Sequence, residues 1–213
     1  CGQLRLEAGS ILENAAIYSH ANYLANGNLT DRTTYEPVVT TTGNVQVKGK
    51  VFISGDAGGR DYGQTGLRVS GTLTLDDGAV LAVYGGEGNT VNTNGGTAIE
   101  LNDGSTITGS GKLIALGGKV LWEDGGTAVS GTGTIATSEA FLQGATASKA
   151  FDAEPGKAVS GNVKLTSASQ HVEDGTVKET TADDPLADLY WKTSIDATPD
   201  LTKYTIPTVS GYV

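Results

Sequence analysis

Acidic side chains recur just before glycines along this chain. Asp76 and Asp77, then Asp103, then Asp124 each stand one or two positions before a glycine. Carboxylate oxygens are the ligands that Ca²⁺ prefers in proteins, and stacked acids repel one another unless a cation lies between them. We therefore expect these four carboxylates to be candidate Ca²⁺ ligands. The alternative is that acidic residues simply favour solvated turns.

A second group of candidates combines aromatic rings with charges near glycine. Arg60, Asp61 and Tyr62 lie in the stretch "GDAGGRDYGQTG", while Tyr84 and Trp122 lie at expected strand ends or loops. A ring in such a place can lie flat against a sugar, and nearby polar groups can hydrogen-bond to the ligand. These five residues are the expected ligand-binding set, for a glycan or for a host or cell-surface protein. The alternative is that the rings cover the core.

The sequence contains no catalytic motif that we recognise from the spacing of its residues. Cys1 is the single cysteine, and His20 and His171 are far apart without partners at metal-ligand spacing. A nucleophile elbow and a phosphate-binding loop are both absent from the sequence. Paired carboxylates such as Asp76 and Asp103 would suit a glycoside hydrolase, but no motif supports them. We expect no catalytic residue, and an enzyme remains the alternative interpretation.

The elements that must position these residues follow a repeated phrase. It reads "LRLEAGSIL" from Leu4, "LTLDDGAVL" from Leu73 and "IELNDGSTI" from Ile99. Alternating apolar residues predict a strand, and an acidic residue followed by glycine predicts a tight turn. Each phrase therefore predicts a strand, a corner and a second strand. For the first phrase the alternative is a helical cap that begins near Ser10, where "SILE" has capping-box spacing.

The phrase returns after 20 to 30 residues. The glycines expected at corners, separated by about 25 residues on average, are Gly49, Gly78, Gly104, Gly125, Gly156 and Gly175. The pairs Ala98–Ile99, Ala128–Val129 and Ala158–Val159 recur at intervals of 30 residues. Such periods are typical of solenoids, whose coils bury their apolar faces by stacking. The sequence predicts an all-β, right-handed, single-stranded parallel β-helix of about five to six coils.

The amino-acid composition and charge limit the classes of molecule that this protein is expected to bind. Glycine contributes 31 of 213 residues and the formal net charge is −10, which favours many turns and disfavours nucleic acid as a partner. No apolar run reaches the roughly 18 to 20 residues of a membrane-spanning helix. Because position 1 is Cys rather than Met, we expect a boundary created by processing, lipidation or excision.

Two resemblances suggest a setting. The repeated phrases over residues 1–180 resemble the glycine-rich parallel β-helix domains, pectin-lyase-like in fold, of bacterial surface and adhesin-like proteins. The ending "LTKYTIPTVSGYV" over residues 201–213 resembles the start of the Listeria-Bacteroides repeat, a small β-grasp-like module of cell-surface proteins. Residues 181–200 would then be a linker or the last wall of the solenoid. These resemblances imply other domains in the same protein.

The function expected from these features is non-catalytic. A β-helix with a flat, repetitive surface suits an extracellular domain of a Gram-positive cell surface that supports adhesion or recognises a glycan or host protein. No cofactor is required, although Ca²⁺ is a candidate. A polysaccharide lyase or glycoside hydrolase and a purely structural stalk are the alternatives, because the same fold supports all three.

Overall fold

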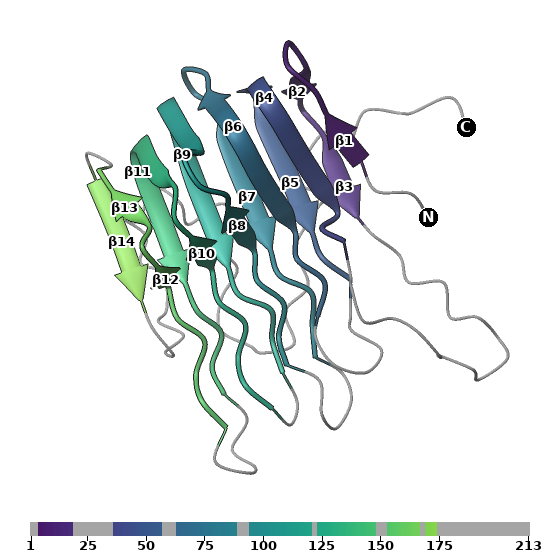
Figure 1. Ribbon diagram of the computed structural model, residues 1–213, viewed down its shortest axis with the longest axis vertical. Coiled ribbons are helices and arrows are strands. Elements are labelled where there is room, and N and C mark those ends of the chain that lie inside the picture. The colour runs from purple at the N-terminus through teal and green to yellow at the C-terminus, as the bar shows by residue number, and fades with distance from the viewer. Residues whose placement is uncertain are drawn as a thin grey trace, which may run out of the picture.

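A computed structural model describes residues 4–18, 36–56, 63–88, 94–120, 123–147, 153–166 and 169–173 of the chain. The described secondary structure is entirely β-strand (Figure 1). The strands are β1 (Leu4–Leu6), β2 (Ile11–Glu13), β3 (Ala16–Tyr18), β4 (Val39–Lys48), β5 (Lys50–Ser54), β6 (Leu67–Leu75), β7 (Val80–Tyr84), β8 (Ile99–Leu101), β9 (Thr106–Leu116), β10 (Val129–Gly131), β11 (Thr134–Gln143), β12 (Val159–Gly161), β13 (Lys164–Leu165) and β14 (Ser169–Glu173).

The strands stack into three parallel walls. The first wall contains β1, the starts of β4 and β6, then β8, β10 and β12. The second contains β2, the ends of β4 and β6, the starts of β9 and β11, and β13. The third contains β3, β5, β7, the ends of β9 and β11, and β14. Every pairing between the described strands is parallel, and each rung contributes a strand segment to all three walls.

This arrangement is a parallel β-solenoid of about four turns, with shorter strands in the first and last rungs. The predicted fold class is confirmed, and the predicted number of coils is close. Strands β2 and β3 occupy the stretch for which a helical cap was the alternative, so the strand interpretation of residues 11–13 and 16–18 is correct. No helix among the described residues is long and apolar enough to cross a membrane.

The spacing of 30 residues corresponds to one turn of the solenoid. Ile99, Val129 and Val159 lie side by side in the first wall, as the repeated alanine-apolar pairs predicted. The longer phrases are less regular. "LRLEAGSIL" and "IELNDGSTI" turn between the first and second walls, whereas "LTLDDGAVL" turns between the second and third. Similar phrases therefore mark different corners, which explains why the period inferred from them varied.

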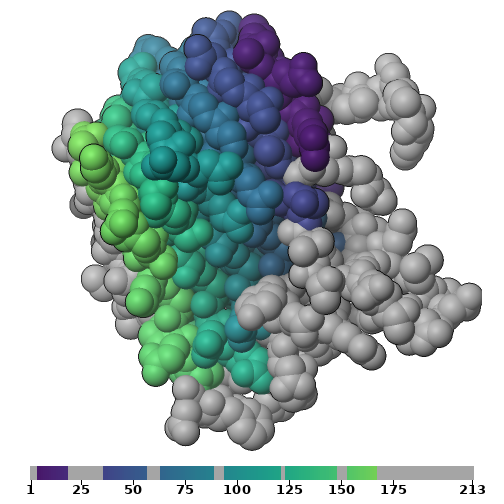
Figure 2. Space-filling view, viewed as in Figure 1, coloured from purple at the N-terminus to yellow at the C-terminus, as the bar shows by residue number. Residues whose placement is uncertain are grey.

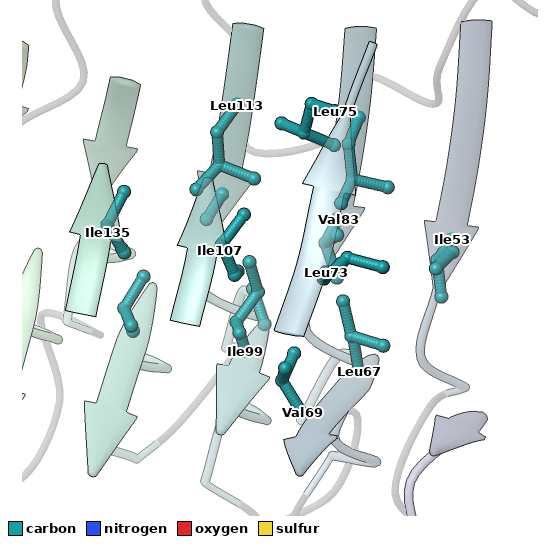
Figure 3. Packing of buried hydrophobic residues seen from close by; sticks show 14 of the residues in the cluster. Ile53, Leu67, Val69, Leu73, Leu75, Val83, Ile99, Ile107, Leu113 and Ile135 are labelled. Atoms are coloured by element: carbon teal, nitrogen blue, oxygen red, sulfur yellow. The ribbon is translucent and has the colours of Figure 1, made fainter. Parts of the chain in front are cut away.

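Inward-facing apolar residues from all three walls form one continuous core. Leu73, Ile107 and Ile135 are neighbours in successive rungs of the second wall, and all are at most 2% exposed (Figure 3). Side chains alternate along each strand, so the intervening threonines of these strands point outward. Burial of this kind contributes roughly 25 cal/mol for each Å² of apolar surface removed from water.

The third wall is apolar on both faces. Its inward residues join the main core, and its outward residues Phe52, Ala82, Ile114 and Phe141 form a second buried cluster. Each of these four side chains is no more than 3% exposed. The third wall thus has the continuous apolar sequence typical of a parallel strand that is covered on both sides.

Candidate binding edge

The chain crosses one edge of the solenoid each time it passes from the third wall to the first wall of the next rung. It leaves the third wall through residues 55–56, 85–86, 117–118 and 144–145. It returns to the first wall through residues 63–64, 95–96, 125–126 and 156–157. We call these segments the glycine seam, because most of their residues are glycine. In Figure 1 they lie below the strands.

Outgoing and returning segments alternate along the seam. The amide of Gly96 donates to the carbonyl of Gly86 at 2.8 Å, and that of Gly118 donates to Gly96 at 2.9 Å. The amide of Gly126 then donates to Gly118 at 2.9 Å, so the bonds join each segment to the next. The ladder begins where the amide of Gln64 donates to the carbonyl of Asp56, and the amide of Gly86 then donates to Gln64. It ends where the amide of Ala145 donates to Gly126 and that of Gly156 donates to Ala145.

The glycine positions of the seam have no room for side chains. A Cβ placed on Gly117 would overlap the carbonyl oxygen of Gly126, and one on Gly85 would overlap the carbonyl oxygen of Gly96. The obstacle is backbone in both cases, so a flexible side chain cannot move aside to relieve it. Backbone packs directly on backbone here, which explains why glycine occurs in pairs at this edge.

Tyr84 is the predicted ligand residue that the structure describes. It is the last residue of β7 and lies directly before Gly85 of the seam. Its ring centroid is 5.0 Å from that of Phe52, which in turn lies 5.6 Å from that of Tyr18. Phe52 is fully buried, whereas Tyr18 is 46% exposed. Burial raises the pKa of the Tyr18 phenol above its ordinary value.

The other predicted ligand residues lie outside the described residues. Arg60, Asp61 and Tyr62 fall in residues 57–62, and Trp122 falls in residues 121–122. The described residues on either side of these two segments belong to the seam or adjoin it. In the sequence, four of the five predicted ligand residues therefore fall between two segments of the seam, and Tyr84 directly precedes one.

The four predicted Ca²⁺ ligands are distributed over different parts of the coil. Asp76 and Asp77 lie at the corner between the second and third walls, and Asp103 lies at the corner between the first and second. Asp124 directly precedes the seam at Gly125. The four acids therefore do not occupy equivalent positions on successive coils, as a stack of acids would require, because similar sequence phrases form different corners. No group of three or more His, Cys, Asp or Glu side chains that could hold a metal ion occurs among the described residues.

Asp124 takes part in hydrogen bonds beside the seam, and Asp76 lies near a lysine. The Asp124 carboxylate accepts from the amide of Glu154 at 2.8 Å, and the amide of Asp124 donates to the Asn94 side chain at 3.2 Å. Asn94, Asp124 and Glu154 thus form a ladder beside the seam. Its signal in the sequence is a polar residue before each returning glycine segment at intervals of 30 residues, which was not recognised. The Asp76 carboxylate lies 3.9 Å from the Lys48 ammonium.

A charge cluster on the first wall was also not predicted. The Arg68 guanidinium lies 2.8 Å from the Glu100 carboxylate and 3.2 Å from that of Glu36. The Thr65 hydroxyl donates to the second oxygen of Glu100 at 3.0 Å. Arg68 and Glu100 are neighbours in adjacent rungs, so the register itself brings the pair together. This arginine therefore neutralises stacked acids.

The architecture defines the chain as a parallel β-solenoid whose turns close through a glycine seam. Comparison with protein-family models, with curated proteins and with solved structures gave no match.

Proposed function

We propose that this chain is a non-catalytic extracellular surface domain that recognises a glycan or a protein on a host or neighbouring cell. One observation supports the proposal above others. The described segments that connect the third wall to the first wall lie together in the glycine seam, and in the sequence the five predicted ligand residues directly precede or fall between these segments. Binding residues in other proteins are often carried on such connections above a rigid scaffold.

The seam suits the role of a rigid base. Each rung is joined to the next by backbone hydrogen bonds in all three walls and again in the seam. A preorganised base lowers the conformational cost of binding, and this favours affinity. In this proposal Tyr62 and Trp122 supply the rings that stack on sugars, and Arg60 and Asp61 supply polar contacts. The Tyr84 ring packs against the buried Phe52 cluster and so supports the base at this edge.

The positions of the acids favour binding over hydrolysis. Strand residues Thr72–Leu75 pair with Thr106–Gly109, and Asp76 and Asp103 lie beyond opposite ends of this paired stretch. Four residues of strand span roughly 13 Å. The two carboxyl groups of a glycosidase lie closer, at about 5 to 10 Å. Arg68, already paired with two glutamates, is poorly suited as a base for a lyase.

The proposal also includes the kind of protein to which this domain belongs. The resemblances of the repeats to adhesin-like, pectin-lyase-like domains and of the ending to a Listeria-Bacteroides repeat support a multidomain protein of a Gram-positive surface. Ca²⁺ binding by Asp76, Asp77, Asp103 or Asp124 would then involve the individual turns, since the four acids do not share one corner.

A glycan array, with a parallel panel of host-surface proteins, tests the proposal with and without Ca²⁺. We expect binding to a restricted set of ligands, weakened at least tenfold by Trp122→Ala or Arg60→Ala. Thr74→Ala, on the outward face of the second wall, is the control and leaves binding unchanged. Any ligand that binds is then assayed for cleavage products. Turnover would favour the carbohydrate-active enzyme, and absence of all binding would favour the structural stalk.

A further inference from the structure

The outward face of the third wall is both apolar and buried. Phe52, Ala82, Ile114 and Phe141 lie side by side on it in successive rungs, and each is at most 3% exposed. By contrast, the outward threonines of the second wall, such as Thr72, are only half-buried. The outward face of the third wall is therefore covered by further protein.

The described strands do not provide this cover. Strands of the third wall pair with one another, and their inward side chains meet the other two walls in the main core. The outward side chains point the opposite way, because side chains alternate along a strand. A phenylalanine side chain has roughly 150 to 250 Å² to remove from water, more than its neighbours in one sheet can cover. Another segment of this chain must therefore lie on the outward face.

Exposure on this face decreases from the first rung towards the last. Figure 2 shows the rungs in order across the described surface, from purple to green. In the column beside the seam, Tyr18 of the first rung is 46% exposed and Gln143 of the fifth is 4% exposed. In the column on the opposite side, Lys50 is exposed, whereas the side chains of Lys112 and Glu139 are 35% and 16% exposed. The cover is therefore most complete over the later rungs.

Two long segments outside the described ranges are continuous with the third wall. Residues 19–35 follow Tyr18 of the first rung, and residues 174–213 follow Glu173 of the last. A cover made by residues 19–35 would be most complete beside the first rung, where the observed exposure is greatest. The segment after Glu173 begins at the end where burial is most complete. Its first part, up to residue 200, contains the large apolar residues Leu186, Leu189, Tyr190, Trp191 and Ile195.

We propose that the outward face of the third wall is a docking surface for residues 174–200 of the same chain, which fold back over it. From Glu173 the far end of the face at Phe52 is four rung spacings away, or roughly 19 Å, which about six residues of extended chain span. Apolar side chains of the segment then pack against the cluster around Ile114 and Phe141. This makes residues 181–200 part of the solenoid domain instead of a linker. The docking is independent of any glycan or protein bound at the seam.

Photo-crosslinking in the full chain identifies the segment that covers the face. Leu116 lies at the margin of the buried cluster and is half-buried, so a larger ring has room there. With p-benzoylphenylalanine in place of Leu116, we expect irradiation to join this position to residues 174–200, as mapped by peptide mass spectrometry. The same probe in place of Thr74, on the outward face of the second wall, is the matched control and gives at least tenfold fewer such crosslinks. Crosslinks mainly to residues 19–35, to another part of the chain or to a second copy overturn the proposal.

Trypsin digestion of the full chain provides the second test, because residues 174–200 contain Lys178 and Lys192. We expect cleavage at these lysines to be slow in the unaltered chain. Leu116→Asp places a charge under the cover, so cleavage should accelerate at least tenfold while the circular dichroism spectrum stays unchanged. Thr74→Asp is the matched control and is cleaved at the unaltered rate. Rapid cleavage of the unaltered chain, or equal rates in the unaltered chain and Leu116→Asp, overturns the proposal.

Discussion

The walls and the glycine seam bring neighbouring rungs together in different ways. In the walls, the space inside the coil is filled by side chains such as Leu113 and Ile107, which are completely buried. In the seam, outgoing and returning backbones touch directly, and the carbonyl of one glycine fills the place of a side chain on the next. The comparison shows that glycine here is a packing residue as much as a turn residue. Substitutions in the two regions should therefore lower the free energy of unfolding by different amounts and through different mechanisms.

The largest effect is expected from Gly117→Ala in the seam. The new methyl group would overlap the Gly126 carbonyl, and backbone on both sides prevents local relief. We expect a loss of about 4 kcal/mol or more in the free energy of unfolding, near the upper end of single substitutions. Urea denaturation followed by circular dichroism measures it. A loss below about 1 kcal/mol would mean that the two segments are not in contact.

The corresponding test in a wall removes a buried side chain, whereas the test in the seam adds a methyl group. Leu113 of β9 is fully buried between Leu81 and Ala140 of the adjacent rungs. We expect Leu113→Ala to cost about 3 kcal/mol, through lost apolar burial and the cavity left behind. The same denaturation experiment measures it, and Leu113→Ile, which nearly conserves volume, should cost less than half as much. Equal losses for both variants would indicate backbone disruption instead of a cavity.

A turn glycine separates conformational strain from crowding. Gly104 has a φ of +70°, yet no atom lies within 4 Å of the position a Cβ would take. Gly104→Ala introduces the same methyl group as Gly117→Ala but meets only the cost of the left-handed conformation, about 1 kcal/mol. Measured side by side, the two variants should differ at least threefold in lost stability. Similar losses would contradict the distinction between seam and turn glycines.

The walls were predictable from the sequence because their physical cause is local. Alternation of apolar residues defines a strand within one rung, and the interval of 30 residues between Ala98 and Ala128 defines the turn of the solenoid. The corners were harder to assign. An acidic residue followed by glycine suits any tight turn, so Asp77–Gly78 and Asp103–Gly104 look alike although they lie at different corners.

The seam could not be predicted, because its cause is not local. Gly96 lies on a returning segment and matters through its bonds to Gly86 and Gly118, which lie 10 and 22 residues away on outgoing segments. In the sequence, a pair of glycines indicates a loop, and nothing nearby shows that another backbone will lie against it. The candidate ligand residues were chosen because they were near glycine, and of the five the structure describes Tyr84 alone, directly before the seam.

The smallest effect is expected from Tyr18, at the end of the third wall on the exposed first rung. Burial raises the pKa of its phenol above the ordinary value of 10.0, so the folded chain retains this proton to a higher pH than the unfolded chain. The resulting stability is fully present below about pH 10 and is lost as the pH rises through the folded pKa. Tyr18→Phe cannot ionise, so its stability should fall less than that of the unaltered chain between about pH 9 and pH 11. Urea midpoints of both proteins over this range measure the difference, with pH 8 as the reference at which the two slopes agree.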